Sequence, residues 1–410
     1  MTDFDVAVIG AGPAGILAAT LLNRQGFNVC VLEKQHFPRF VIGESLLPYA
    51  VDLLDAAGLY AAVRGEPRFQ TKTGAAFSRG GDYAAFEFAN KNCASSDTAL
   101  HVYRDRFDYL LAREAERQGV ALRFGETVTA FDNKGAKAAL SVESDRGHTY
   151  TVTASFVLDA SGYGRVLPRL LGWDIPSDLP ARQVHFTHIE DNITDTVFDR
   201  SKTLVTVHPQ KRDVWLWLTP FADGRSSIGA VGLSERLGSD ASSREILQRT
   251  VREMPLPARL LAGAVWENDV PFIYLRSYSV GIKSLCGRHF AVLGNAAEFL
   301  DPVFSSGITM TLHSAKLAAS LVAKELYDTP VDWEREFAAK LAVGTRTFRA
   351  MVSGWYDGRL QEVVFGHYRN EKVRRYLSSI LAGYAWDESN PFVRNPEAGL
   401  QALYDHTAQR

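Results

Sequence analysis

The first 34 residues contain two apolar runs separated by a stretch with helical spacing. FDVAVIG (4–10) and NVCVLEK (28–34) have the continuous apolar character of short buried strands. PAGILAATLLNRQG (13–26) has the spacing of a helix that ends at a glycine. This order predicts a strand–helix–strand unit whose two strands run parallel in one sheet.

The same pattern returns further along the chain. RFDYLLAREAERQG (106–119) is a second helix pattern, VALRFG (120–125) and TASFVLDASG (153–162) read as strands, and 289–326 reads as strand, loop and long helix, with the helix beginning at about Ile308. We therefore expect one lobe built discontinuously from residues 1–71, 101–179 and 276–330.

The intervening segments, 72–100 and 180–275, are rich in strand-like runs such as LVTVHP, VWLWLTP and SSIGAVGL. They predict a second lobe on an antiparallel sheet, on the substrate side of the molecule. Residues 331–410 have helical patterns and predict a C-terminal tail of helices. A chain of 410 residues exceeds the size at which one core stops growing, so separate lobes are expected.

Two tryptophans stand out within VWLWLTP. Trp215 and Trp217 are two positions apart, so on a strand both indoles point to the same face of the sheet. His185 and His188, three positions apart, would point to opposite faces, which indicates structural roles and no metal pair. The tryptophan pair would form a large aromatic surface, and an ordinary core does not need one of that size.

Composition narrows the function classes. The net charge is −2 with no long run of one sign, so nothing favours nucleic acid or an anionic membrane. The three cysteines are an odd number with no C-x-x-C spacing, so neither a disulfide framework nor a zinc site is implied, and the cytoplasm is the expected location. Because we find no run of 18 or more apolar residues, we expect no integral membrane segment.

GAGPAG (10–15) lies where the first strand turns into the first helix. Gly10 suits the tight turn, Gly12 lets a pyrophosphate approach the backbone, and Gly15 allows close packing of helix on strand. Glu33, at the end of the second strand, can accept hydrogen bonds from a ribose. The sequence contains no second copy of this fingerprint, so a permanently held flavin dinucleotide fits better than a nicotinamide that comes and goes.

Further motifs make the chain similar to a known family. GAGPAG, RFVIGESLLP (39–48), Arg104 before a helix, DASG (159–162) and GNAAEFLDPVFSSG (294–307) resemble the FAD-dependent oxidoreductases of the aromatic hydroxylase type. IGESLLP, WLWLTP and FLDPVFSSGI resemble more particularly the flavin-dependent halogenases. The resemblance implies an α/β fold: a Rossmann-like FAD-binding domain, the antiparallel second lobe and the helical tail.

The resemblance also implies a set of cofactor contacts. Asn295 stands where many relatives carry aspartate, and Ser305 would lie near the flavin ring. Small residues and free backbone N–H groups before the helix at Ile308 can hold a halide, chloride or bromide, for which the candidates are Ser306 and Gly307. The residues implied to bind FAD are Gly10, Gly12, Pro13, Ala14, Gly15, Glu33, Arg39, Ser45, Arg104, Asp159, Gly162, Asn295, Pro302, Ser306, Gly307 and Ile308.

The catalytic residues implied by the resemblance are Lys72, Trp215, Trp217 and Glu44. In halogenases reduced FAD and O2 convert a halide to hypohalous acid, which meets a lysine before it reaches the substrate. A primary amine can hold the oxidised halogen beside an electron-rich ring. The tryptophan pair would separate flavin from substrate, and Glu44 would couple the flavin to the halide site.

Departures from the family pattern bear on the substrate. Phe304 stands where tryptophan halogenases carry a catalytic glutamate, which argues against free tryptophan and favours a phenol or pyrrole, free or bound to an acyl carrier protein. Trp355, Tyr356, Phe365 and Tyr368 in the tail could line the pocket or pack the helical core. A separate NAD(P)H flavin reductase would supply FADH2.

Two alternatives stay open. Thr219 replaces the isoleucine that halogenases carry before the proline, and isoprenoid (geranylgeranyl-type) reductases have a related aromatic-x-Trp-x-x-Pro signature. The chain could therefore be such a reductase. It could also be an inactive FAD-binding protein that has kept the fold.

Overall fold

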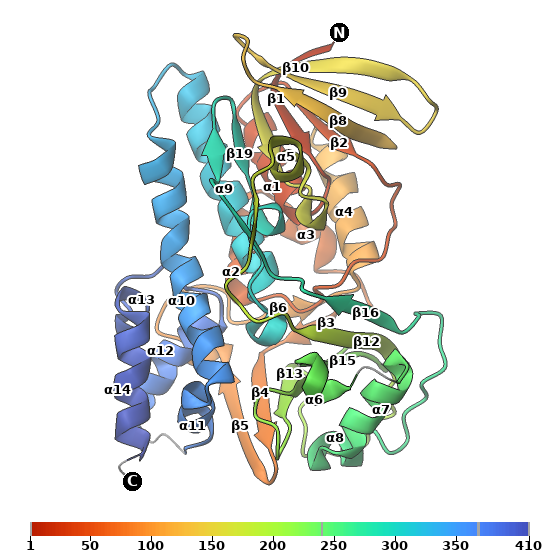
Figure 1. The fold of residues 1–410 in the computed structure, drawn as a ribbon, viewed down its shortest axis with the longest axis vertical. Helices are drawn as coiled ribbons and strands as arrows, with labels where there is room; N and C mark the ends of the chain where they lie inside the picture. Colours follow the sequence, from red (N-terminus) through yellow and green to blue (C-terminus); the bar gives the residue numbers. More distant parts are fainter. Residues whose placement is uncertain (1, 239–240, 367–369, 409–410) are drawn as a thin grey trace.

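The computed structural model describes residues 2–238, 241–366 and 370–408. Figure 1 shows a first lobe that contains the N-terminus, a second lobe below it, and the C-terminal helices along one side of both. The short elements are α3 (Tyr60–Val63), α5 (Val166–Leu171), α6 (Ser234–Leu237), and the single turns at Phe88–Asn90, Gly162–Gly164, Gly294–Ala296, Pro302–Phe304 and Glu334–Ala338.

The first lobe is built on an eight-stranded sheet. Its parallel strands lie in the order β19 (Phe290–Val292), β10 (Thr149–Asp159), β1 (Thr2–Ile9), β2 (Val29–Glu33) and β7 (Ala121–Phe124). An antiparallel edge is formed by β18 (Cys286–Gly287), and an antiparallel extension by β8 (Glu126–Asp132) and β9 (Ala138–Ser144). The predicted strand–helix–strand unit is therefore confirmed, whereas the β8–β9 hairpin was not anticipated.

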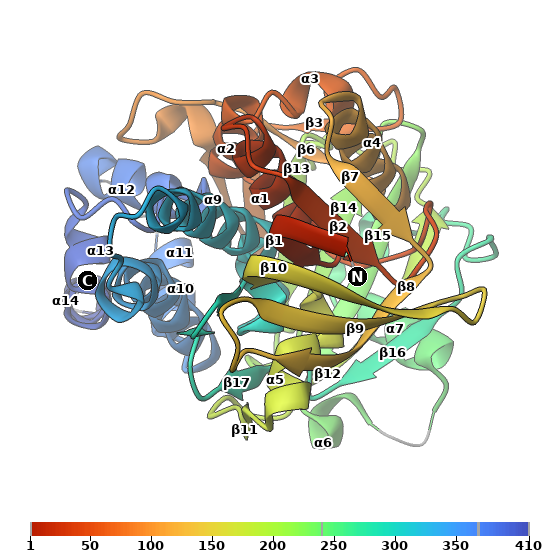
Figure 2. The ribbon, with the colours of Figure 1, turned by 90° about the horizontal axis from the view of Figure 1, so that it is seen from above.

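The two faces of this sheet are covered differently, as Figure 2 shows from above. Val6 and Val8 of β1 pack towards helices α1 (Pro13–Asn23), α4 (Arg104–Arg117) and α9 (Ser306–Leu326). Ala7 and Ile9 of the same strand pack towards the β8–β9 hairpin and α5. Because side chains alternate across a strand, burial on both faces requires the continuous apolar run seen in the sequence.

The second lobe is built on a seven-stranded sheet. Its order is β16 (Ile273–Arg276), β12 (Gln183–Glu190), β15 (Arg225–Gly232), β14 (Trp215–Pro220), β13 (Lys202–Val207), β4 (Gly74–Arg79) and β5 (Asp82–Glu87). All neighbours are antiparallel except β13 and β4, which run parallel. The expected antiparallel lobe is thus confirmed, with one parallel pairing that joins segments distant in the sequence.

The two faces of this sheet pack against different helices. Leu216 and Leu218 of β14 face α7 (Ser243–Arg252) and α8 (Pro255–Leu260). Trp215 and Trp217 share a core with the C-terminal helices, which are α10 (Ala339–Tyr356), α11 (Arg359–Phe365), α12 (Glu371–Leu381), α13 (Pro391–Arg394) and α14 (Pro396–Ala408). The strand pattern and the helical tail are therefore both as predicted.

Two short ladders connect the lobes. One pairs β3 (Gln70–Lys72) with β6 (Ala99–His101), and the other pairs β11 (Asp174–Pro176) with β17 (Val280–Ile282). Helix α2 (Pro48–Ala56) packs on α9 nearby. Lys72 is the last residue of β3, so this ladder places the predicted lysine at the boundary between the lobes. Within the described residues, no helix has the length and apolar character needed to span a membrane.

Candidate active site

The glycines of the fingerprint have different physical requirements. Gly10 has φ +97°, and a Cβ there would lie 2.7 Å from the carbonyl oxygen of Ala160. A Cβ on Gly15 would lie 1.9 Å from the carbonyl oxygen of Gly10, so only glycine lets α1 start so close to the turn. Near Gly12, by contrast, only the Arg39 guanidinium comes within 4 Å, at 3.9 Å. The backbone at Gly12 is therefore open to a ligand.

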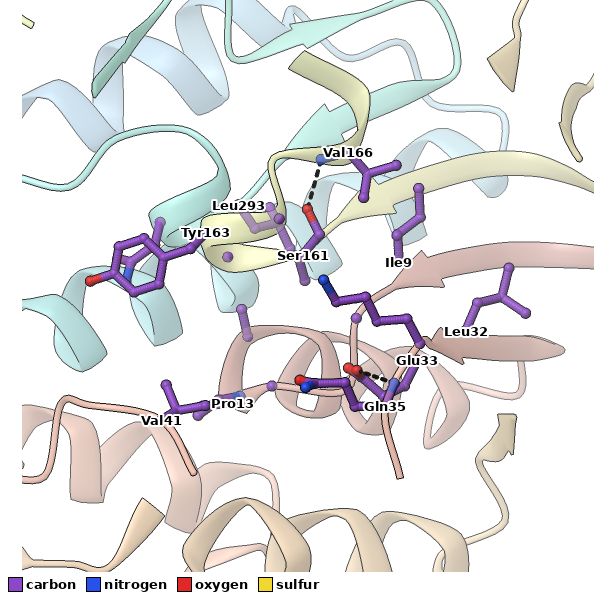
Figure 3. A pocket seen from close by; sticks show the side chains of 18 of the residues that line it. Ile9, Pro13, Leu32, Glu33, Gln35, Val41, Ser161, Tyr163, Val166 and Leu293 are labelled. Carbon is purple, nitrogen blue, oxygen red and sulfur yellow. Dashed lines mark hydrogen bonds between the residues drawn. The ribbon is translucent and has the colours of Figure 1, made fainter. Parts of the chain in front are cut away.

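Gly12 borders a cavity of about 360 Å³, which we call the fingerprint cavity (Figure 3). Pro13 and Glu33 lie on one side of it, and Ser161 and Tyr163, from the segment after β10, face them across the space. The Glu33 carboxylate accepts hydrogen bonds from the N–H groups of Ala11 and Gln35, both at 2.9 Å. These bonds hold Glu33 beside the cavity, where it keeps further lone pairs for a ligand.

A second cavity, of about 110 Å³, shares part of its lining with the first. We call it the tryptophan cavity, because Trp215 and Trp217 both line it. The residues common to the two cavities are Ile42, Arg104, Tyr163, Asn295 and Ile308. A long ligand could therefore extend from the glycine turn to the tryptophan pair.

Arg104 and Arg39 are held by one buried carboxylate. Arg104 donates two hydrogen bonds to Asp108, at 2.9 and 3.0 Å, and Arg39 donates a third at 2.9 Å. Arg104 also donates to the carbonyls of Ile42 and Gly43. The two arginines and Asp108 thus form a buried ion-pair cluster, and Arg104 holds the backbone at residues 42–43 in place. Both arginines also line the fingerprint cavity.

Most of the expected cofactor contacts lie at the walls of the two cavities. Those that do so are Gly10, Gly12, Pro13, Ala14, Glu33, Arg39, Ser45, Arg104, Gly162, Asn295, Pro302, Gly307 and Ile308. Gly15, Asp159 and Ser306 are not in either lining. Asp159 is buried and accepts hydrogen bonds from the N–H groups of Ser161 and Leu167, so it shapes the loop behind the wall. Ser306 is the buried first residue of α9, which begins two residues before the predicted Ile308.

The tryptophan pair is fixed at both indole nitrogens. The ring centroids are 6.1 Å apart. Trp215 donates to the Tyr356 hydroxyl at 2.8 Å, and Trp217 donates to the Ser227 hydroxyl at 3.1 Å. A Cβ on Gly229 would lie 2.1 Å from the Trp217 ring, so the neighbouring strand makes room for it. Both rings are therefore held rigidly beside the cavity.

Asp301 connects the tryptophan pair to the start of α9. Its buried carboxylate accepts hydrogen bonds from the hydroxyls of Tyr356 (2.8 Å) and Tyr278 (3.2 Å) and from the N–H of Val303 (3.1 Å). Burial raises the pKa of Asp301 to about 6. Directly after the turn at Pro302–Phe304, Ser305 adopts φ +56° and is the N-cap residue of α9. Sequence reasoning missed Asp301, although FLDP was among the motifs.

The tail aromatics are packing residues at this site. Trp355 is fully buried against Phe77 and Phe304, and Phe365 is buried in the same core. Tyr356 contacts Trp215 and Asp301 through its hydroxyl. Tyr368 lies outside the described residues. None of the three described aromatics lines the two cavities, so the interpretation as helical core fits better.

Lys72 is buried, with 1% of its surface exposed. Its Nζ donates to the Ser45 hydroxyl at 2.8 Å and to the Leu46 carbonyl at 3.2 Å. In the described part of the chain no carboxylate pairs with it, and burial lowers its pKa to about 7. The amine is therefore largely neutral above that pH, unlike a surface lysine.

Lys72 borders a small space of about 10 Å³, the lysine cavity. Phe304 and Leu381 close this space on the side of the C-terminal helices. Thr203, Val205, Val303 and Ser305 line both the lysine cavity and the tryptophan cavity. These four residues form a partition, with Lys72 on one side and the tryptophan pair on the other.

Glu44 belongs to a buried pair that the sequence did not predict. Its Oε1 lies 2.6 Å from His188 Nε2, and Glu44 also lines the tryptophan cavity. Burial by itself lowers the pKa of His188, but the charge of Glu44 outweighs it and raises the pKa. Glu44 Oε2 and His188 Nδ1 find no hydrogen-bond partner among the described residues. His185 lies on the opposite face, as the spacing predicted, and its Nδ1 hydrogen-bonds the Ser243 hydroxyl.

Comparison with known proteins decides the family. Residues 3–254, more than half of the chain, match the family described as "FAD binding domain". The chain belongs to this FAD-binding family. The cofactor of the flavoprotein is therefore FAD, as the glycine fingerprint and Glu33 predicted.

Two curated relatives are halogenases. A tryptophan 2-halogenase from Chondromyces crocatus is 32% identical over 330 residues, which are 77% of this chain and 60% of that protein. A chlorinase of 1H-pyrrole-2-carbonyl-peptidyl-carrier protein from Pseudomonas fluorescens is 28% identical over 77% of this chain and 75% of its own length. The chain thus spans about three fifths of the first relative. The resemblance to flavin-dependent halogenases, an oxidoreductase class, is confirmed.

A solved structure covers almost the whole flavoprotein. A flavoprotein/dehydrogenase from Cytophaga hutchinsonii has a TM-score of 0.94 and 38% identity, with 99% of each chain covered. The expected fold class is confirmed by this match over both lobes and the helical tail.

The residues present fit FAD at both ends of the connected cavities. The open backbone at Gly12 and the N-terminus of α1 suit the pyrophosphate, and Glu33 suits a ribose hydroxyl. The tryptophan cavity, bordered by Pro302 and Asn295, suits the flavin ring. Bound there, FAD supplies redox chemistry that the side chains of the protein do not have.

Proposed function

We propose that the flavoprotein is a halogenase, or a halogenase-like monooxygenase, that uses FADH2, O2 and chloride or bromide to halogenate an electron-rich aromatic compound. The observation that carries this proposal is the burial of Lys72 without an acidic partner, one partition away from the tryptophan cavity. A buried lysine without an ion pair reduces stability, so its presence is best explained by its chemistry.

Lys72 would receive the oxidised halogen. Its largely neutral amine is a nucleophile. Hypohalous acid formed in the tryptophan cavity would reach this amine by passing between Thr203, Val205 and Ser305, which line both cavities. Trp215 and Trp217 would keep a larger aromatic substrate away from the flavin ring. Glu44, with its free carboxylate oxygen at the same cavity, would couple the flavin to the halide site.

The start of α9 is the halide site in this proposal. Gly307 lines the tryptophan cavity, and Ser306 precedes it in the first turn of a helix of 21 residues. The first N–H groups of a long helix have no partner within it and favour an anion. Ser305, in the left-handed conformation, brings the chain sharply into this turn.

The substrate we propose is a phenol or a pyrrole, free or attached to an acyl carrier protein. Phe304 offers an apolar surface beside the lysine cavity in place of an acid. The carrier-bound form is supported by the name of the Pseudomonas relative.

A separate NAD(P)H flavin reductase would supply FADH2. The three cysteines are free thiols, which suits the cytoplasmic location we propose.

The test is product analysis with two lysine variants. The purified protein, with FAD, a flavin reductase, NADH, O2 and bromide, is expected to add bromine to members of a phenol and pyrrole panel, as mass spectrometry would detect. Lys72→Met should abolish the brominated product. Lys91→Met is the control, because Lys91 is equally buried but pairs with Asp97 away from both cavities. Retention of halogenation by Lys72→Met would refute the role of Lys72.

A second candidate is an FAD-dependent reductase of isoprenoid double bonds, because Thr219, which departs from the halogenase pattern, lines the tryptophan cavity. This candidate predicts that a prenyl lipid copurifies and that it reoxidises reduced flavin without oxygen. The cavities next to the tryptophan pair and Lys72 measure about 110 and 10 Å³, compared with roughly 300–1,000 Å³ for typical ligand pockets. This small size argues against a prenyl lipid as substrate. A flavoprotein with neither reaction would instead be an inactive FAD-binding protein.

A further inference from the structure

A chain of hydrogen bonds leads from Lys72 to a backbone carbonyl on another strand. Lys72 Nζ lies 2.8 Å from Ser45 Oγ, which lies 2.9 Å from Thr203 Oγ1. Thr203 Oγ1 lies 2.9 Å from His101 Nε2, and His101 Nδ1 lies 2.8 Å from the carbonyl oxygen of Pro220. The chain therefore connects β3, β13, β6 and β14 through the interior.

The carbonyl of Pro220 fixes the direction of every bond in this chain. A carbonyl oxygen only accepts, so His101 Nδ1 must carry the hydrogen. Burial, and next the charge of Lys72, hold the pKa of His101 well below its ordinary value, so its Nε2 is an acceptor. Thr203 then donates to His101, Ser45 donates to Thr203, and Ser45 accepts from Lys72.

This order determines what remains free on the amine. Lys72 has a second acceptor in the Leu46 carbonyl at 3.2 Å. A neutral amine has two hydrogens and one lone pair, so with both hydrogens engaged only the lone pair is available. Burial lowers the pKa of Lys72. The pKa of His101 is lowered first by burial and then by the charges of Lys72 and Arg200.

The chain ends inside the protein. His101 and Thr203 are both buried, and the last acceptor is a backbone carbonyl. A proton passed to this end would find no exit to solvent, which indicates that the chain orients the amine and does not transport protons. Ser45 and Thr203 also line the tryptophan cavity, and Thr203 borders the lysine cavity.

We propose that Ser45, Thr203 and His101 are positioning residues for Lys72, which keep both of its amine hydrogens engaged and leave the nitrogen lone pair free for an oxidised halogen. This inference rests on the proposed function for its chemical purpose. The arrangement of the amine itself can be tested without turnover.

The test follows the titration of Lys72 in the full-length protein with FAD bound. Lysine labelled with carbon-13 at Cε gives an NMR signal, which Lys72→Met identifies by its disappearance. In Thr203→Val the Ser45 hydroxyl loses its acceptor and turns to donate to the amine lone pair. A hydrogen bond to the neutral form disfavours protonation, so the midpoint should fall by about half a pH unit or more.

Two further variants and a control define the result. Thr203→Ser keeps the hydroxyl and should titrate like the wild type, whereas Ser45→Ala removes an acceptor of the ammonium form and should also lower the midpoint. Thr206→Val is the matched control, since Thr206 is equally buried on the same strand but bonds Ser78.

In a halogenation assay we expect about a tenfold loss of product per reduced flavin for Thr203→Val, and less than about twofold for Thr203→Ser and Thr206→Val.

The outcomes separate this inference from the proposed function. If the midpoint is unchanged in both Thr203→Val and Ser45→Ala, the positioning chain is wrong, whatever the activity. If the midpoint falls in these variants but the wild type halogenates nothing, the positioning chain stands and the proposed function fails.

Discussion

Lys72 lies in an environment that lysine side chains normally avoid. It is buried, its partners are a hydroxyl and a carbonyl, and its pKa falls from 10.5 to about 7. Between these two values the unfolded chain holds a proton that the folded chain has released. Raising the pH through this window therefore stabilises the fold, and below pH 7 the cost is complete, on the order of 5 kcal/mol.

Lys72→Met should accordingly stabilise the protein while abolishing the proposed activity. The gain is reduced by the lost hydrogen bonds to Leu46 and Ser45, which leaves about 2 kcal/mol at pH 7. At a pH above about 10.5 the lysine is neutral in both states, so only the lost hydrogen bonds remain and the variant should be less stable than the wild type. Urea unfolding at the two pH values measures this difference.

The control for this prediction is Lys91→Met. Lys91 is buried to the same degree but has Asp97 as partner, so its replacement should destabilise the fold by about 1 kcal/mol. A Lys72→Met variant that is destabilised at pH 7 would mean that the amine is a structural residue.

Among the elements, the turn before α9, strand β14 and helix α10 act together. Tyr356 of α10 accepts from Trp215 of β14 and donates to Asp301 in the turn. The sequence predicted the strand and the helical tail separately, because each has its own periodicity. Their connection through one hydroxyl has no local signal, since the three residues are far apart in the chain.

Tyr356→Phe tests this connection. The buried Trp215 N–H loses its acceptor, so we expect a loss of about 1–3 kcal/mol in the free energy of unfolding. A loosened tryptophan pair should also release more hydrogen peroxide, with less halogenated product per reduced flavin. Unfolding curves and a peroxide assay measure the two effects.

Tyr49→Phe provides the comparison, because its hydroxyl bonds His313 and it lines neither large cavity. It should reduce stability without changing peroxide release. If Tyr356→Phe also leaves peroxide release unchanged, the hydroxyl does not control the tryptophan pair.

At the scale of the whole molecule, the site is assembled from all three parts of the chain. The first lobe contributes the fingerprint cavity, the second sheet contributes the tryptophan pair, and α12 closes the lysine cavity with Leu381. About 10 Å³ beside Lys72 holds roughly one water, so an aromatic substrate requires this closure to open.

Leu381→Ala should enlarge the lysine cavity. We expect a cost of about 2–4 kcal/mol in stability and a shift of the substrate range towards bulkier phenols. Leu403→Ala, in a buried position of α14 that lines none of these cavities, should have a similar cost and leave the substrate range unchanged. Product analysis over phenols of increasing size measures the shift, and equal ranges for the two variants would contradict it.

The sequence by itself determined the elements and the cofactor turn. The periods of apolar residues predicted β1, α1, β2 and β14 within a few residues, and the helical character of the C-terminal tail without the bounds of its helices, because these patterns depend on neighbours in the chain. Gly10, Gly12 and Gly15 indicated the turn for the same reason: their requirements are set by the local backbone. The parallel pairing of β13 with β4 had no such local signal.

Only the tertiary structure decided how the residues of the site meet. The strand spacing predicts a structural role for His188, but only folding identifies its partner, Glu44, at 2.6 Å and 144 residues away in the sequence. Lys72, Ser45, Thr203 and His101 likewise come from four segments. A pKa shift or a fixed hydrogen-bond direction arises from burial and charge pairing. Both depend on what surrounds a side chain in space, so the spacing of residues along the chain cannot predict them.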